Sequence, residues 1–280
     1  MTAHARSELI GARRIVVKVG SSSISGENAG KIQPIVEALA AAHARGTEVV
    51  LVSSGAIATG MPYLLLAERP SDLATQQAAA AVGQNVLIYR YQASLTPFGI
   101  VAGQVLLTAG DLENPMHRSN ARRAMERLLG LRILPIVNEN DTVATHEIRF
   151  GDNDRLAALV GQLVGADALI LLSDIESLYT RPPDEPGARP IHDVAYDDDL
   201  HGFEFGSVVV NSVGTGGAAT KVSAARLAAA SGIGVLVTSA DLVGAALSGE
   251  EIGTWFRPHP EPVAAPATGP IRTAVDTLGG

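Results

Sequence analysis

Short runs of aliphatic and β-branched residues alternate with helix-like segments along most of the chain, and this alternation limits the possible fold more than any other feature. The apolar runs lie at residues 13–20, 48–53, 99–107, 132–137, 167–172 and 233–237. Segments with helical spacing of apolar residues separate them at 30–45, 71–94, 118–129, 154–164 and 222–230. Buried strands that alternate with helices predict an α/β fold, a three-layer αβα sandwich with a mostly parallel central sheet.

This pattern predicts one domain over residues 1–256, because no internal repeat or linker interrupts it. The Pro- and Asp-rich segment 181–199 is typical of a surface excursion. Residues 257–280 contain five prolines, so we expect an extended or disordered tail.

Composition excludes several classes of function. The absence of cysteine rules out disulfides, thiolate metal sites and a cysteine nucleophile. A net charge of −8 argues against broad nucleic-acid binding. The most membrane-like window, 156–172, divides at Gly165 into a helix and a strand, so we expect no membrane span. With no signal-peptide pattern at the N-terminus, the sequence predicts a cytoplasmic protein.

Four polar motifs follow directly after predicted strands. They are Lys18, Ser54, the turn 138–141 and the pair Ser173-Asp174. Ligands of parallel α/β sheets bind beyond the carboxyl ends of the strands. These four motifs, distant in sequence, are therefore expected to meet at one edge of the sheet and form a site.

The stretch 138–154 carries more carboxylates and amides than a turn requires. The simpler interpretation is that Asp152 or Asn153 only caps the helix that follows. Segment 142–150 lies between the two polar ends of this stretch and has the alternating pattern of a hairpin arm. We expect this arm to set the distance between the two polar ends. The acidic run 197–199 is more typical of a solvated turn than of a metal site, and we assign no residue as a metal ligand.

A glycine-rich run, 214–221, opens the helix predicted at 222–230. Backbone N–H groups at a helix start can hold a phosphate, although the run matches neither the P-loop nor the dinucleotide fingerprint and could be a simple flexible loop. Lys221 favours the phosphate interpretation, because the chain otherwise uses arginine for almost every cation. Lysine gives a compact point charge that arginine does not replace. Of the other two lysines, Lys31 is expected at the surface and Lys18 at the site.

Together these groups suit phosphoryl transfer, which needs positioning and electrostatics more than covalent chemistry. Lys18 and Lys221 could neutralise charge on the transferring group while Asp154 or Asp152 holds both ammonium groups. Catalysis by histidine is disfavoured, because the seven histidines are scattered and His146 lies in the alternating segment.

Five ordered motifs resemble those of the glutamate 5-kinases in the amino acid kinase family. The motifs are Val17–Ser22, Val52–Ala58, Ile136–Asp141, Phe150–Asp154 and Gly214–Gly217 with Lys221. The resemblance covers about residues 13–256. It implies transfer of the γ-phosphoryl group of ATP to the side-chain carboxylate of L-glutamate, with Mg²⁺ carried mainly by the ATP phosphates, as the first step of proline biosynthesis.

The resemblance also implies roles for individual residues. Lys18 and Lys221 correspond to phosphate-stabilising catalytic lysines that also contact the nucleotide, and Asp154 to their organiser. The residues that correspond to glutamate contacts are Ser54, Asp141 and Asn153. Those that correspond to nucleotide contacts are Ser173, Asp174, Thr215, Gly216, Gly217, Ala218, Ala219 and Thr220. Asp141 makes chemical sense in this role, because its carboxylate can pair with a free α-ammonium that an N-acetylated glutamate lacks.

Further expectations follow from the family. They include feedback inhibition by proline, a homo-oligomer (dimer or tetramer), and handover of the labile acyl phosphate to glutamate-5-semialdehyde dehydrogenase. Many relatives carry a C-terminal PUA domain, and this sequence is too short for one. The sequence departs from many relatives at Ala218, Arg149 and Ser177, where Met, Lys and Gly are common, and this affects expectations of rate and nucleotide affinity rather than of reaction class.

Two alternatives remain. The chain could be another amino acid kinase, acting on N-acetylglutamate, carbamate or uridylate. It could also be a non-catalytic amino-acid sensor on the same fold, although both lysines and Asp154 are present.

Overall fold

The computed structural model describes residues 2–24, 26–144, 153–198, 200 and 217–261. Its strands are β1 (Arg14–Lys18), β2 (Glu48–Val52), β3 (Ala102–Leu107), β4 (Leu134–Glu139), β5 (Ala168–Ser173), β6 (Leu178–Tyr179), β7 (Pro190–Ile191), β8 (Asp193–Val194), β9 (Gly234–Ser239) and β10 (Thr254–Phe256). Its α-helices are α1 (Ile32–Ala44), α2 (Ala56–Gly60), α3 (Leu73–Leu95), α4 (Ala109–Glu113), α5 (Pro115–Gly130), α6 (Asn153–Val164), α7 (Ala218–Ala230) and α8 (Val243–Leu247).

Eight strands form one sheet in the order β3-β4-β2-β1-β5-β9-β10-β8. Every neighbouring pair from β3 to β9 is parallel, and β10 runs antiparallel to β9. The prediction of a three-layer sandwich on a mostly parallel sheet is confirmed. Because these strands are parallel, the carboxyl ends of β4, β2, β1, β5 and β9 lie side by side at one edge.

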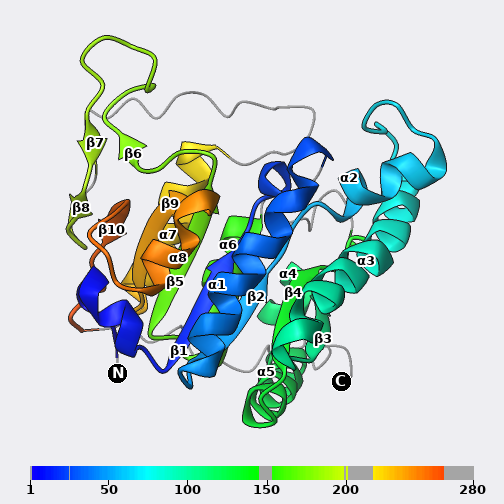
Figure 1. Ribbon diagram of the computed structural model, residues 1–280, viewed down its shortest axis with the longest axis horizontal. Helices are drawn as coiled ribbons and strands as arrows, with labels where there is room; N and C mark the ends of the chain where they lie inside the picture. The colour runs from blue at the N-terminus through cyan, green and yellow to red at the C-terminus, as the bar shows by residue number, and fades with distance from the viewer. Residues whose placement is uncertain (1, 25, 145–152, 199, 201–216, 262–280) are drawn as a thin grey trace, which may run out of the picture.

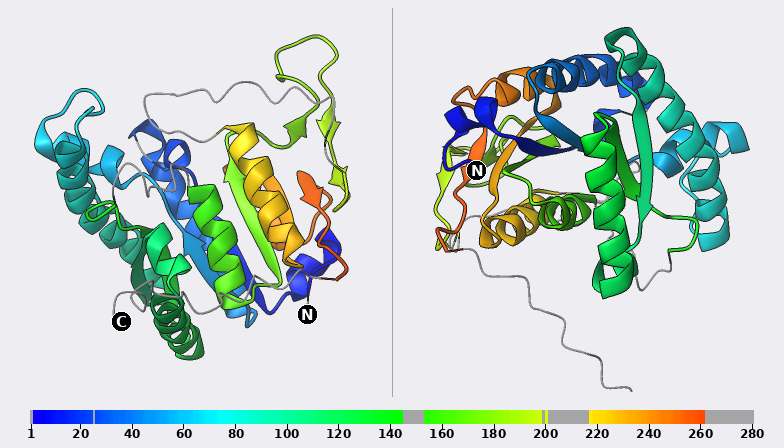
Figure 2. Two further views of the ribbon diagram at one scale, coloured as in Figure 1. Left: turned by 180° about the vertical axis from the view of Figure 1, so that it is seen from behind. Right: turned by 90° about the horizontal axis from the view of Figure 1, so that it is seen from below.

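Helices cover both faces of the sheet (Figures 1 and 2). Successive residues of β1 belong to opposite cores, since Ile15 and Val17 pack with α1, α3 and α8 whereas Val16 packs with α5, α6 and α7. This period-two pattern explains why each central strand is apolar throughout. None of the helices in the described parts of the chain is both long and apolar enough to cross a membrane.

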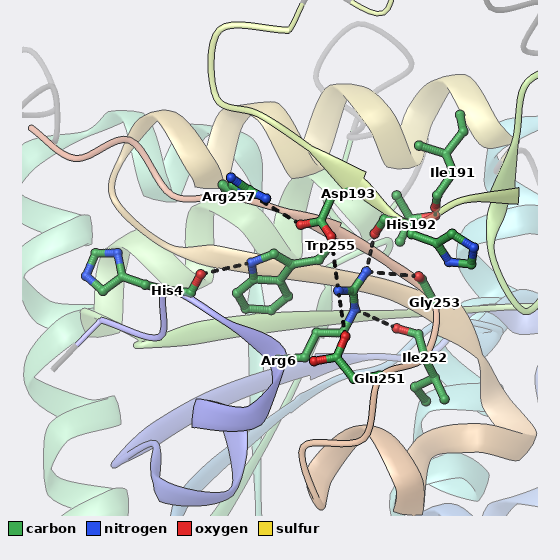
Figure 3. A network of polar contacts seen from close by, with 11 residues as sticks. His4, Arg6, Ile191, His192, Asp193, Glu251, Ile252, Gly253, Trp255 and Arg257 are labelled. Atoms are coloured by element: carbon green, nitrogen blue, oxygen red, sulfur yellow. Dashed lines mark hydrogen bonds and ion pairs between the residues drawn. The ribbon is translucent and has the colours of Figure 1, made fainter.

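A buried arginine fastens the N-terminal segment to the far edge of the sheet (Figure 3). The guanidinium of Arg6 donates to the carbonyl oxygens of Ile252 (2.9 Å), Gly253 (3.3 Å) and His192, and it pairs with the carboxylate of Asp193 at 3.3 Å. Arginine suits this position because its planar fork offers several donors at fixed angles.

Two parts of the chain are more closely integrated than the sequence pattern predicts. The Pro- and Asp-rich excursion contributes β8, which pairs with β10 in the main sheet through Val194 and Phe256. Beyond the expected domain end at Phe256, the N–H of Arg257 donates to Val194 and that of His259 donates to Ala229. Residues 262–280, and with them most of the predicted disordered tail, lie outside the described residues.

Two glycines let α2 and α3 pack backbone against backbone. A Cβ on Gly60 would lie 1.9 Å from the carbonyl oxygen of Ala79, and a Cβ on Gly83 would lie 1.7 Å from that of Ala56. Neither obstacle is a flexible side chain, so the two helices would have to separate. This contact holds α2 in place immediately after the loop of Ser54 and Gly55.

We therefore expect Gly83→Ala to lower the free energy of unfolding by about 1–3 kcal/mol, the usual cost of overpacking. Gly130→Ala is the control, because Gly130 is also a helical glycine, the last residue of α5, but a Cβ added there would meet nothing within 4 Å. Urea unfolding monitored by circular dichroism measures both variants. Equal stability of the two would contradict the close-contact account.

Candidate active site

Two ammonium groups meet one buried carboxylate at the carboxyl edge of the sheet. Lys18 Nζ lies 2.5 Å from Asp154 Oδ1, and Lys221 Nζ lies 3.5 Å from Asp154 Oδ2. All three side chains are buried, with 3%, 8% and 0% exposure for Lys18, Lys221 and Asp154. The structure thus brings together the three residues predicted to be catalytic.

Each member of this Lys18–Asp154–Lys221 cluster is placed by a different element. Lys18 ends β1, Asp154 is the second residue of α6, and Lys221 is the fourth residue of α7. A carboxylate in a first helical turn is favoured by the helix dipole, whereas an ammonium there is disfavoured. Lys221 therefore depends on Asp154 as its counter-charge.

Thr220 fixes the geometry between α7 and α6. Its hydroxyl lies 3.3 Å from Asp154 Oδ2 and 2.8 Å from the carbonyl oxygen of Gly217, and the Gly217 N–H donates to it at 3.1 Å. The nucleotide contact of Thr220 stays a prediction, and in the structure its hydroxyl contacts the organising carboxylate. A threonine in the first turn of α7 is the only sequence signal for this role, and it also fits ordinary capping.

Among the described residues, the cluster joins two cationic side chains to one anionic side chain. Burying three charges is costly unless each is paired, so the site is favourable for an additional anion. Helices α6 and α7 lie side by side on one face of the sheet and both begin at this edge (Figure 2). A phosphate at this point would meet two ammonium groups and the N-terminal end of α7.

Asn153 connects the cluster to the segment after β2 and to the end of β4. Its side-chain amide donates to the carbonyl oxygen of Ser53 at 2.6 Å and to Asn138 Oδ1 at 2.8 Å. Asn138 Oδ1 also accepts from the N–H of Glu139 at 2.9 Å. Asn138 is thus a site residue whose individual role the sequence did not reveal, since an asparagine after a strand usually belongs to a turn.

The other predicted glutamate contacts lie on the same side of Lys18. Ser54 is half-buried and follows β2, and the next residue, Gly55, takes a left-handed conformation with φ 87° as the N-cap of α2. Asp141 is half-buried in the turn that follows β4. The structure confirms that these segments share the carboxyl edge, and the contacts of Ser54 and Asp141 with an amino acid stay a prediction.

The predicted nucleotide contacts lie on the opposite side of Lys18. Ser173 is buried at the end of β5, and its hydroxyl donates to Asp174 Oδ1 at 3.0 Å. Gly217, Ala218 and Ala219 lie at the start of α7, which begins four residues earlier than the sequence pattern predicts. Thr215 and Gly216 lie outside the described residues, as do Arg149, Asp152 and His146.

The order of the strands therefore sorts the predicted residues by role. Along the edge β4-β2-β1-β5, Asp141 and Ser54 come first, Lys18 lies in the middle, and Ser173 comes last.

Among the described residues, no three His, Cys, Asp or Glu side chains group to hold a metal ion. Asp197 and Asp198 are exposed in a turn, as the solvated interpretation expected.

The sequence model of the amino acid kinase family matches residues 13–239. The chain belongs to the amino acid kinase family. Three similar members of this family are named glutamate 5-kinase. The relative from Clavibacter sepedonicus is 72% identical over 91% of this chain and 98% of its own length. Those from Leifsonia xyli subsp. xyli and Salinispora arenicola are 70% and 53% identical, over 96% and 93% of this chain and 100% and 72% of their own lengths.

Solved structures agree on the fold of this amino acid kinase. A carbamate kinase from Giardia lamblia bound to AMP-PNP superposes with a TM-score of 0.66, covering 89% of this chain and 100% of its own. Its sequence identity is 15%, so the likeness supports the architecture alone.

Replacing the organising carboxylate tests whether it holds the cluster together. We expect Asp154→Asn to lower the free energy of unfolding by about 3–5 kcal/mol, because it removes the carboxylate that faces both buried ammonium groups. Asp241→Asn is the matched control, because Asp241 also pairs with a lysine, Lys31 at 3.1 Å, but its side chain is 70% exposed. The control should cost at most about 1 kcal/mol. Similar losses in urea unfolding would contradict a special role for Asp154.

Proposed function

We propose that this amino acid kinase transfers the γ-phosphoryl group of ATP to the side-chain carboxylate of L-glutamate. The observation that carries the proposal is the buried Lys18–Asp154–Lys221 cluster between the two groups of predicted substrate contacts. Identity of 70–72% with relatives named glutamate 5-kinase supports the choice of glutamate. The reaction would be the first step of proline biosynthesis.

In this reaction a carboxylate oxygen of glutamate forms a bond to the γ-phosphorus as the bond from that phosphorus to the ADP oxygen breaks. The acceptor needs no general base, because a glutamate side chain with a pKa of about 4.3 is already ionised at neutral pH. Asp154 accordingly serves as a counter-charge for the lysines and not as a base. Each lysine would contribute about 3–4 kcal/mol of transition-state stabilisation, as preorganised donors typically do.

The described donor groups suit a nucleotide whose phosphates carry their own metal. Both oxygens of Asp154 already face cationic or hydroxyl groups, namely Lys18, Lys221 and Thr220. We therefore assign Mg²⁺ mainly to the ATP phosphates, where it would neutralise part of their negative charge. Ser173, Asp174 and the start of α7 would hold the rest of the nucleotide.

Recognition of the amino acid is assigned to the segments after β2 and β4. The half-buried carboxylate of Asp141 would pair with the free α-ammonium of glutamate, which N-acetylglutamate lacks. This pairing separates the proposal from an N-acetylglutamate kinase. Release of ADP with N-acetylglutamate but not with glutamate would refute it.

Several properties of related enzymes are carried into the proposal with the activity. They are a cytoplasmic location, feedback inhibition by proline, a homo-oligomeric state (dimer or tetramer), and transfer of the labile product to glutamate-5-semialdehyde dehydrogenase. Their support is the similarity to proteins named glutamate 5-kinase. Glutamate-dependent ADP release, measured with and without proline, tests the activity and its inhibition in one assay.

Replacing each lysine tests the phosphoryl-transfer mechanism. We expect Lys18→Ala and Lys221→Ala each to lower kcat by about two to three orders of magnitude, because each removes a donor to the transferring group. Lys31→Ala is the control, because Lys31 is the one lysine of the sequence outside the cluster and pairs with the exposed side chain of Asp241. ADP release coupled to NADH oxidation reports all three. Near-normal turnover in either site variant would contradict the mechanism.

Replacing Asp141 tests amino-acid recognition separately. We expect Asp141→Asn to raise the KM for glutamate by about tenfold or more, because it removes the charge partner of the α-ammonium. The KM for ATP should change by less than about twofold, since only one substrate loses a contact. An unchanged glutamate KM would remove Asp141 from the assigned contacts.

A further inference from the structure

Helix α3 carries three polar side chains that reach the amino-acid side of the site. Gln77, Gln84 and Tyr91 are spaced seven residues apart, about two helical turns, so they lie along one face of the helix. The remainder of this face is mainly alanine and leucine. Three polar groups in one line on a helix that packs against the core require partners.

The most deeply buried of the three is Tyr91, which has no exposed surface. Its hydroxyl lies 3.0 Å from the hydroxyl of Ser53. Burial raises the pKa of Tyr91 far above its usual value, so it stays a neutral hydrogen-bonding group at any physiological pH. Ser53 in turn offers its carbonyl oxygen to Asn153 and precedes Ser54.

Gln84 and Gln77 reach the segment after β4. Gln84 Nε2 donates to the carbonyl oxygen of Glu139 at 3.3 Å, and Gln104 Nε2 on β3 donates to Gln84 Oε1 at 3.5 Å. Gln77 Nε2 donates to the carbonyl oxygen of Ala144 at 3.3 Å. These two glutamines therefore bracket the turn that contains Asp141.

The close contact of Gly60 with Gly83 also connects α3 to the loop that carries Ser54. It places the backbone of α3 against α2, whose first residue follows Ser54 and Gly55 directly. Within the described chain, the hydrogen bonds of Gln77, Gln84 and Tyr91 go to β3, to the last residue of β4 and to the segments after β2 and β4, and none goes to β5 or α7. The helix thus supports one half of the site selectively.

We propose that α3 is the positioning element for the amino-acid half of the site, with Gln77, Gln84 and Tyr91 as positioning residues. They touch neither substrate. They hold the two segments that carry Ser54 and Asp141 at a fixed separation from Lys18. This inference rests on the proposed function, because it takes the segments after β2 and β4 to bind glutamate.

The test is to separate the two Michaelis constants in variants of α3. We expect Gln84→Met and Tyr91→Phe each to raise the KM for glutamate about fivefold, the usual effect of one lost buried hydrogen bond. The KM for ATP should change less than twofold. Gln77 is only half-buried, so Gln77→Met should fold normally and raise the glutamate KM about twofold.

Two residues of the same helix provide matched controls. Gln92 bonds to the carbonyl oxygen of Ile100 (3.1 Å) and accepts from the N–H of Ala102 (2.8 Å), at the opposite edge of the sheet. Gln92→Met should lower the thermal midpoint without changing the glutamate KM. Tyr89 is 72% exposed, so Tyr89→Phe should change neither quantity.

The outcomes distinguish this inference from the proposed function. If the unaltered protein shows no glutamate-dependent ADP release, the proposed function fails and the inference fails with it. If the unaltered protein turns over glutamate but the KM for glutamate is unchanged in Gln84→Met, Tyr91→Phe and Gln77→Met, the inference alone fails. Equal increases in both Michaelis constants, or the same increase in Gln92→Met, would also overturn it, because they indicate general loosening of the fold. Should Gln84→Met or Tyr91→Phe fail to fold, Gln77→Met decides the question.

Discussion

Asp154 is completely buried, and a buried carboxylate is tolerated only when cations or donors surround it. Here the partners come from two separate elements, since Lys18 ends β1 and Lys221 lies in the first turn of α7. An ammonium in that turn opposes the helix dipole, so Lys221 needs Asp154 as much as Asp154 needs the lysines. The pairing therefore fixes how β1, α6 and α7 meet, and it places the positive charge of two ammonium groups where a phosphate would lie.

Strand order then determines which chemistry lies on each side of that charge. Because β1 lies between β2 and β5, Lys18 separates the segments after β2 and β4 from Ser173 at the end of β5. An acceptor held on one side and a nucleotide held on the other would face each other across the lysines. Phosphoryl transfer needs the attacking and leaving oxygens roughly in line, and this linear arrangement along a sheet edge provides a basis for it.

The sequence was sufficient to predict the central sheet and the convergence of the polar motifs, because apolar runs and strand ends are local signals. It could not predict the strand order, which depends on how crossovers pack. It also treated 181–199 as a surface excursion, whereas β8 joins the sheet through only two residues, too few to form a pattern. Thr220 and Asn138 were similarly ambiguous, since caps and turns use the same residues as sites.

Helix α3 illustrates why the residues that position a site are harder to predict from the sequence than the site residues themselves. Gln84 and Tyr91 sit among alanines in a segment whose pattern indicates only a buried helix, and their partners Glu139 and Ser53 lie 55 and 38 positions away in the chain. The bonds of Gln84 to Glu139 and of Gln77 to Ala144 end on backbone carbonyl oxygens, which no side-chain motif reveals. The Gly60–Gly83 contact gives this arrangement its rigidity, because the backbones of α2 and α3 cannot move apart without losing it. The position of the Ser54 loop is thereby tied to helix α3.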